Sequence, residues 1–230
     1  MKIAGIVGGI GPESTIEYYR GIVRLYRERN PDGSYPRIVI NSIDAGRMLG
    51  LFGGNQIVEA TDYLAGEVER VARAGADFGV VAANTPHLVF DALQQRSSIP
   101  LISIVDATCR AAKARGLRRV GLLGTRYTMA APFYPDGLAR AGIEMALPSR
   151  EDQDYVHEKY MGELVAGVAR PETKEGLLAV VERMRALDRT EAVILGGTEL
   201  SLILHDGDAV VPLLDTTRIH VEEIVTRILS

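Results

Sequence analysis

Polar residues that could do chemistry follow an apolar run in the stretch VVAANTPH, Val80 to His87. Four apolar residues that turn abruptly polar are typical of a buried strand ending at a functional loop. Asn84 and Thr85 offer hydrogen-bonding groups there. His87, two residues further on, is a candidate base, because a neutral imidazole can accept a proton near pH 7. The small Ala83 at the tip of the strand has no group that can take part.

A second stretch, LGGTEL, holds the matching acidic candidate, Glu199. Partial burial of a carboxyl group raises its pKa towards values that suit acid–base catalysis at neutral pH. The two stretches belong to a weak internal repeat: FGVVAANT followed by IPLISI recurs as AVILGGTE followed by VPLLDT. In this repeat Ala83 corresponds to Gly197, and AGIVGG near the N-terminus corresponds to VGLLGT further on. The repeat predicts two tandem α/β halves.

Short β-branched runs alternate with amphipathic stretches along the chain, which indicates βαβ units and parallel sheets. In the first expected helix, PESTIEYYRGIVRLYRER, Pro12 stands where a missing donor costs nothing. Apolar residues follow at helical spacing: Ile16, Tyr19, Val23 and Tyr26. The other expected strands and helices are RIVINSI, NQIVEATDYLAGEVERVARAG, FGVVAA, LISIV, RRVGLLG, AVILGG, AVVPLLD and the C-terminal TTRIHVEEIVTRILS.

Ligands of parallel sheets bind beyond the carboxyl ends of the strands. If the two halves face each other, one cleft is lined by Gly8 to Pro12, Ala83 to Thr85, Gly124 to Tyr127 and Gly197 to Glu199. The alternative is that these are short βα turns that happen to use small residues.

Composition excludes several function classes. The 230 residues carry a net charge of −4 with scattered Lys and Arg, so no basic surface for nucleic acid is expected. No apolar run approaches the roughly 18 residues of a membrane span, and the N-terminus begins directly with a strand pattern, which predicts a cytoplasmic protein. A single cysteine, Cys109, allows no intrachain disulfide and no cysteine-based metal cluster.

Cofactor and metal motifs are weak in this sequence. GGIGPES partly imitates a dinucleotide-binding fingerprint, but its third glycine is replaced and Asp44 lies beyond the usual spacing of about 20 residues. No phosphate-binding loop, zinc-binding His-Glu-x-x-His or Gly-x-Ser-x-Gly is present. We expect neither a cofactor nor a metal.

Three motifs resemble those of one known family. GIVGGIGPESTIEYYR, ANTPH and LGGTEL are similar to the signatures of the cofactor-independent aspartate/glutamate racemases, and the similarity covers nearly the whole chain. The resemblance implies two similar Rossmann-like α/β halves related by a pseudo-two-fold axis, with the ligand cleft between them. It also implies a homodimer and a C-terminal segment that returns to the first half, with residues 1–100 and 209–230 forming that half and 101–208 the second.

Racemases of this family pair two cysteines on opposite sides of the substrate α-carbon. The corresponding positions in this chain hold Ala83 and Gly197, which cannot accept a proton. Two-thiol racemisation is therefore excluded for this sequence. Cys109 is no substitute, because DATCRAAKARG is typical of a helix in which a lone thiol belongs to the core.

The carboxylate-binding motif residues are nevertheless present. The resemblance implies that Asn84, Thr85, Thr198 and loop amides, including those of Gly9 and Gly11, hold the α-carboxylate. Convergent donors of this kind suit a carboxylate. Arg47 is expected either to bind a side-chain carboxylate or to be a solvated surface residue. The lesser candidates are His157, Tyr127 and Asp44.

Three hypotheses of function follow. The first is a divergent isomerase or lyase of amino acid metabolism that acts at the α-carbon of a small amino acid or carboxylate, with Glu199 or His87 as the base. The second is a non-catalytic relative that binds carboxylates. The third is an engineered cysteine-less racemase.

Overall fold

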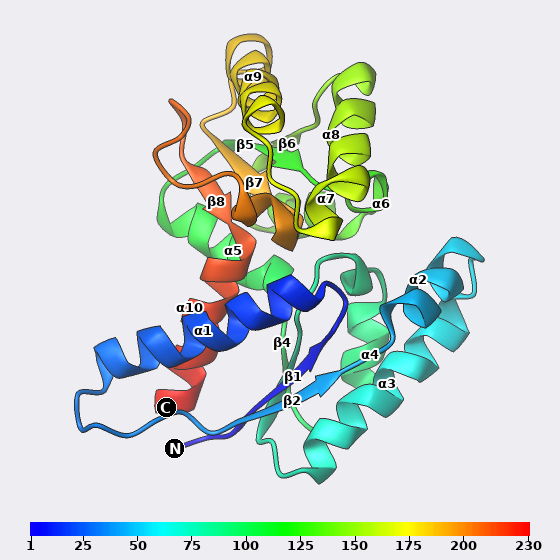
Figure 1. The fold of residues 1–230 in the computed structure, drawn as a ribbon, viewed down its shortest axis with the longest axis vertical. Helices are drawn as coiled ribbons and strands as arrows, with labels where there is room; N and C mark the ends of the chain where they lie inside the picture. Colours follow the sequence, from blue (N-terminus) through cyan, green and yellow to red (C-terminus); the bar gives the residue numbers. More distant parts are fainter. The chain divides into compact units, whose positions relative to one another are not determined.

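Two compact units make up the computed structural model, which describes residues 1–230. The first unit comprises Met1–Ile104 and His220–Ser230, and the second Val105–Ile219. Each contains one four-stranded parallel sheet, with the orders β2-β1-β3-β4 and β6-β5-β7-β8 (Figure 1). The identical order confirms the predicted α/β class and the internal repeat, because strands that correspond in the sequence occupy equivalent places in the two sheets.

The elements of the first unit follow the expected alternation. They are β1 (Ala4–Gly8), α1 (Pro12–Arg29), β2 (Ile38–Ser42), α2 (Ala45–Gly53), α3 (Ile57–Arg73), β3 (Phe78–Val81), the 3₁₀ helix η1 (Thr85–Val89), α4 (Phe90–Arg96) and β4 (Leu101–Ile102). The C-terminal helix α10 (Thr216–Leu229) adds its last turns to this unit.

Helices cover both faces of the first sheet. Side chains of β1 alternate between the faces, as strand geometry requires. Ile6 packs with Tyr18 of α1 and Ile224 of α10, whereas Val7 packs with Leu64 of α3 and Met48 of α2. The tips of β1, β2 and β3 therefore emerge from a sheet that is fixed on both sides.

The second unit repeats this plan. Its elements are α5 (Ile104–Ala114), β5 (Arg119–Leu123), α6 (Arg126–Ala130), α7 (Phe133–Arg140), β6 (Glu144–Ala146), α8 (Arg150–Gly162), η2 (Leu164–Ala166), α9 (Pro171–Asp188), β7 (Ala192–Leu195), η3 (Thr198–Leu202) and β8 (Leu213–Asp215). On one sheet face, Leu123 and Leu195 pack with Tyr160 of α8 and Val180 of α9.

Three details differ from the expectations. Strand β6 was not predicted, because its three residues Glu-Met-Ala contain no β-branched run. The buried face of α1 is formed by Tyr18, Ile22 and Tyr26, while Ile16 and Tyr19 are exposed. The second unit extends to Ile219 rather than to residue 208, because β8 pairs with β7 in the second sheet.

None of the helices combines the length and the apolar character that a membrane crossing requires.

Candidate functional site

In the first unit, the loop after β1 is shaped by glycine. Gly9 has φ +81°, and a Cβ there would lie 2.7 Å from the backbone N of Ile43, so only glycine fits. The N–H of Gly9 donates to Thr15 Oγ1 at 2.8 Å, and Thr15 N–H donates to the carbonyl of Gly11 at 3.1 Å. The Gly9 amide, predicted to bind a carboxylate, is thus already bonded within its own loop.

The loop after β3 lies at the same sheet edge, because β1 and β3 are neighbouring parallel strands. Ala83 and Asn84 are buried there, and Thr85 begins η1 with its side chain half-buried. Three of the predicted residues of the first unit are therefore consecutive in one tight turn at the carboxyl end of the sheet.

His87 holds this turn through both of its ring nitrogens. Nε2 accepts the Ile104 N–H at 3.1 Å, so the hydrogen is on Nδ1, which donates to the carbonyl of Ala83 at 3.0 Å. The ring also stacks on Phe90, with centroids 4.9 Å apart. Burial lowers the pKa of His87 from 6.5 to about 4. This geometry favours a structural role for a neutral His87 over the role of catalytic base that the sequence suggested.

Arg47 lies apart from these loops, on α2. Its N–H donates to the side chain of Asp44, which caps that helix, at 3.2 Å. Its guanidinium stacks over the ring of Tyr63 of α3, with the Cζ atom 4.6 Å from the ring centroid. Arg47 is exposed, so a carboxylate-binding role stays a prediction.

In the second unit, the loops after β5 and β7 pack closely. A Cβ at Gly124 would lie 2.9 Å from the carbonyl oxygen of Gly196, so glycine is needed for this approach. The Gly196 N–H donates to the carbonyl of Leu123 at 2.7 Å. This contact fixes the backbone on which Gly197, Thr198 and Glu199 follow.

The space beside Gly197 is filled by Tyr160 of α8. A Cβ at Gly197 would lie 2.8 Å from Tyr160 Oη and 2.9 Å from Cζ, well inside van der Waals contact. Gly197 has φ −151°, an extended conformation that any residue can adopt, so the tyrosine and not the backbone excludes a side chain.

Glu199 is buried, with 5% of its surface exposed, and its Oε2 accepts two hydrogen bonds. One comes from the Tyr160 hydroxyl and the other from Thr198 Oγ1 at 2.9 Å. Burial, and then the charge of Glu199, raise the pKa of Tyr160 well above its usual value, so the phenol keeps its proton and donates it. The arrangement is a buried carboxylate held by two hydroxyl donors.

Tyr160 was missed by the sequence-based prediction. Its signal in the sequence is only helical spacing with Val156 and Leu164, which is typical of a core position. Its hydroxyl becomes significant only because α8 packs against the loop after β7, which the sequence does not specify.

Two of the lesser candidates, His157 and Tyr127, belong to the second unit, whereas Asp44 caps α2 in the first. His157 of α8 accepts the Arg126 N–H on Nδ1 at 3.2 Å and packs edge-on against Tyr127, with centroids 6.4 Å apart. Burial lowers the pKa of His157. These contacts join α8 to the loop after β5.

Cys109 lies in the interior of the second unit. Its Sγ packs against Gly137 of α7, where a Cβ would come within 3.1 Å of the sulfur. Burial raises the pKa of its thiol to about 11, with a smaller contribution from Asp106. The expectation of a core cysteine agrees with this environment.

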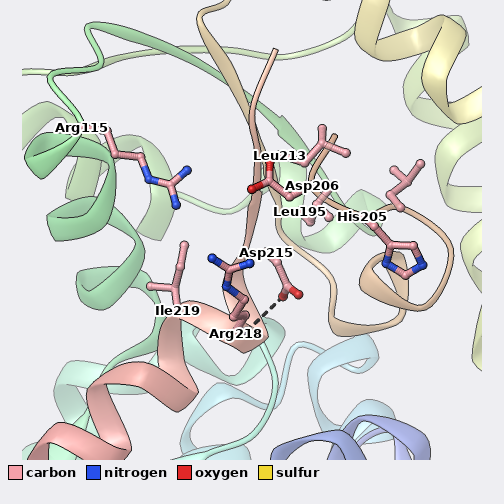
Figure 2. A pocket seen from close by; sticks show the side chains of 9 residues that line it. Arg115, Leu195, His205, Asp206, Leu213, Asp215, Arg218 and Ile219 are labelled. Atoms are coloured by element: carbon pink, nitrogen blue, oxygen red, sulfur yellow. Dashed lines mark hydrogen bonds between the residues drawn. The ribbon is translucent and has the colours of Figure 1, made fainter. Parts of the chain in front are cut away.

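A separate cavity of about 200 Å³ lies by the carboxyl ends of β7 and β8. In Figure 2 the guanidinium groups of Arg115 and Arg218 point toward the same open space as the Asp206 carboxylate. Asp215 accepts the Arg218 N–H at 3.1 Å, and burial raises the pKa of its carboxyl group. None of the residues predicted for the site lines this cavity.

The structure contains no cluster of three or more His, Cys, Asp or Glu side chains suited to a metal.

Comparisons with known proteins identify the family. The sequence model of the Asp/Glu/hydantoin racemases matches residues 7–224. The chain belongs to the Asp/Glu/hydantoin racemase family. An aspartate racemase homologue from Pyrococcus horikoshii has 35% identity and a TM-score of 0.88, with each chain covered completely.

Two further relatives of this racemase family are more distant. The aspartate racemase of Picrophilus torridus shares the fold, with 21% identity and a TM-score of 0.78 over 99% of this chain and 94% of that one. The broad specificity amino-acid racemase RacX of Bacillus subtilis is 22% identical over 226 residues, which are 93% of this chain and 92% of the relative.

Proposed function

We propose that this racemase-family protein binds a small amino acid or a related carboxylic acid and removes its α-proton by a route without thiols. Glu199 is the proposed base. The RacX relative is a broad specificity amino-acid racemase, which supports a broad search for the substrate.

The observation that carries the proposal is the buried carboxylate of Glu199 at the loop after β7. A buried ionisable group at the carboxyl end of a parallel strand is a candidate for function, because burial there is unfavourable unless something compensates for it. The hydroxyl of the adjacent Thr198, predicted as a carboxylate ligand, donates its hydrogen to Glu199, so it supports the proposed base instead of a substrate carboxylate. Gly197 adds no side chain beside the Tyr160 ring.

The proposed step balances without a cofactor. The Glu199 carboxylate takes the α-proton and becomes a carboxylic acid, while the electron pair of the broken C–H bond passes into the substrate carboxylate. Hydrogen-bond donors to that carboxylate stabilise the added charge. Return of a proton from Glu199 regenerates the starting enantiomer. Protonation of the opposite face by water gives the other enantiomer and a hydroxide ion, which the carboxylic acid of Glu199 neutralises, so that the carboxylate and the water are both regenerated.

Solvent deuterium tests the proposal whatever the product. The wild-type protein in D₂O is incubated with a panel of D- and L-amino acids, and the α-position is followed by ¹H NMR. We expect slow exchange, because loss of a general acid or base costs about 10² to 10⁴ in rate and both thiols are absent. Glu199→Gln should abolish the exchange, and Glu158→Gln, an exposed glutamate on α8, should preserve it.

If Glu199→Gln exchanges as fast as the wild type, Glu199 is not the base. If the wild-type protein shows saturable binding of amino dicarboxylates by calorimetry but no exchange, the non-catalytic alternative replaces the proposal. The predicted ligands of the first unit, Asn84 and Thr85, are tested in the same assays by Asn84→Ala and Thr85→Ala. Homodimerisation and a cytoplasmic location remain predictions, the former open to analytical ultracentrifugation.

A further inference from the structure

Tyr160 and Gly197 form a complementary pair. The tyrosine ring occupies the volume that a side chain at position 197 would need, and a Cβ there would approach Oη to 2.8 Å. Close packing of this kind is shape-specific, since protein interiors leave few voids and tolerate little overpacking.

The same tyrosine bonds to the proposed base. Its hydroxyl donates to Glu199 Oε2, the oxygen that also accepts from Thr198 Oγ1 at 2.9 Å. Tyr160 has only 6% of its surface exposed and comes from α8, whereas Glu199 is in η3. The hydrogen bond therefore joins two elements through residues that lie 39 positions apart in the chain.

We propose that Tyr160 is a positioning residue for Glu199: its ring replaces a side chain at position 197, and its hydroxyl holds the Glu199 carboxylate in place for proton transfer. This inference rests on the proposed function. Its physical basis is that a hydrogen-bond donor fixes the orientation of a carboxylate, and proton transfer is sensitive to small misplacements of the base.

The phenol acts as a donor and not as a base. Burial and the neighbouring carboxylate oppose loss of its proton. Tyr160 thus differs from the thiols that the family uses, because it assists the acid–base group and does not itself exchange protons with the substrate.

Tyr160→Phe is the decisive variant, since it keeps the ring against Gly197 and removes only the hydroxyl. Tyr155→Phe is the matched control: Tyr155 is on the same helix, but its hydroxyl lies beside Gly176. Exchange rates from D₂O are measured against substrate concentration and pH for both variants and the wild type.

For Tyr160→Phe we expect the maximal exchange rate to fall roughly tenfold or more. The half-saturating concentration should change less than about threefold, because the lost hydroxyl orients the base and does not itself bind the substrate. Tyr155→Phe should match the wild type. An unchanged maximal exchange rate in Tyr160→Phe would overturn the inference.

Absence of exchange in the wild type would refute the proposed function but would not decide the role of Tyr160. A double-mutant cycle of Tyr160→Phe and Glu199→Gln in urea unfolding then decides it. Effects on the unfolding equilibrium that are non-additive by at least about threefold would support the positioning contact. Additive effects would overturn it.

Discussion

The ring of Tyr160 lies so close to the backbone of Gly197 that a Cβ at position 197 would come within 2.9 Å of both Cζ and Oη. Glycine at this position is therefore matched to the tyrosine of α8, and the backbone conformation itself does not demand it. This relationship bears on the hypothesis of an engineered cysteine-less racemase, because replacing a cysteine alone does not account for a tyrosine ring in the space that a side chain at position 197 would need.

Gly197→Ala should destabilise the protein by about 1 to 3 kcal/mol, since the added methyl group overpacks the site. Tyr160→Leu in the same chain should recover part of this loss by making room. Urea unfolding of the two single variants and the double variant measures the coupling. Gly162→Ala is the control, because a Cβ there meets nothing within 4 Å; equal effects of the two glycine substitutions would contradict the packing argument.

Cysteines introduced at positions 83 and 197, the positions that correspond to the family's thiols in the sequence comparison of motifs, should not give rapid racemisation while Tyr160 is present. Ala83→Cys with Gly197→Cys is expected to stay slow, because the second side chain has no space beside the ring. Adding Tyr160→Leu should increase the rate of α-proton exchange from D₂O. High activity of the two-cysteine variant with Tyr160 intact would instead favour an engineered origin.

His87 should make the stability of the protein depend on pH between 6.5 and about 4. Burial lowers its pKa in the folded state, so the unfolded chain binds the proton first as the pH falls. The stabilisation is complete above pH 6.5 and is lost towards pH 4, and its full size is roughly 3 kcal/mol.

Urea unfolding at several pH values tests this dependence. His87→Asn should be less stable at pH 7 but should lose less stability on acidification. Leu88→Asn replaces an exposed, non-titrating neighbour of His87 and should keep the wild-type dependence. Identical pH profiles for His87→Asn and the wild type would show that His87 does not titrate as the structure indicates.

Asp215→Asn should leave the protein as stable as the wild type at pH 7 or make it more stable. Burial raises the pKa of Asp215, so the folded state disfavours the charged carboxylate. Stability is therefore lost as the pH rises above 3.8, the ordinary pKa of an aspartate, because the unfolded chain then releases the proton first. The amide oxygen of asparagine can still accept the Arg218 N–H that Asp215 caps.

Asp208→Asn provides a control of opposite sign. Lys174 lowers the pKa of Asp208, so the charged form stabilises the fold, and its removal should reduce stability at pH 7. Both variants are compared with the wild type by urea unfolding at pH 4 and pH 7. A loss of stability at pH 7 in Asp215→Asn would contradict the interpretation of the buried carboxyl.

Cys109 should resist thiol reagents in the folded protein. Its thiol is buried and its pKa is raised to about 11, so little thiolate exists near neutral pH. Labelling by iodoacetamide at pH 7.5 should be slow without urea and fast in urea, and it should leave any α-proton exchange unchanged. Rapid labelling of the native protein together with loss of exchange would return Cys109 to the list of catalytic candidates.

The sequence alone was sufficient to predict the fold class and most of the helices and strands. Helix α1 spans Pro12–Arg29 as its pattern predicts, because Pro12 at the first turn and the helical spacing of apolar residues are local signals. The internal repeat predicted two α/β halves, and the structure adds that corresponding strands take the same place in each sheet. Local patterns are enough for such properties because they depend on residues near one another in the chain.

Tertiary packing decided the rest. Tyr18 and Ile22 are buried in α1 instead of Ile16 and Tyr19, because α1 packs against both the sheet and α10. The two nitrogens of His87 are engaged by Ala83 and by Ile104, 17 residues away, which no spacing rule indicates.

The environment of Glu199 is a further product of tertiary structure. The sequence places Gly197, Thr198 and Glu199 in one loop, but the tyrosine that contacts this loop is 39 residues away from Glu199, on another helix. Motifs specify which residues follow a strand. Which side chain fills the space above them is determined only when distant elements pack together, because burial and hydrogen bonding depend on neighbours in space.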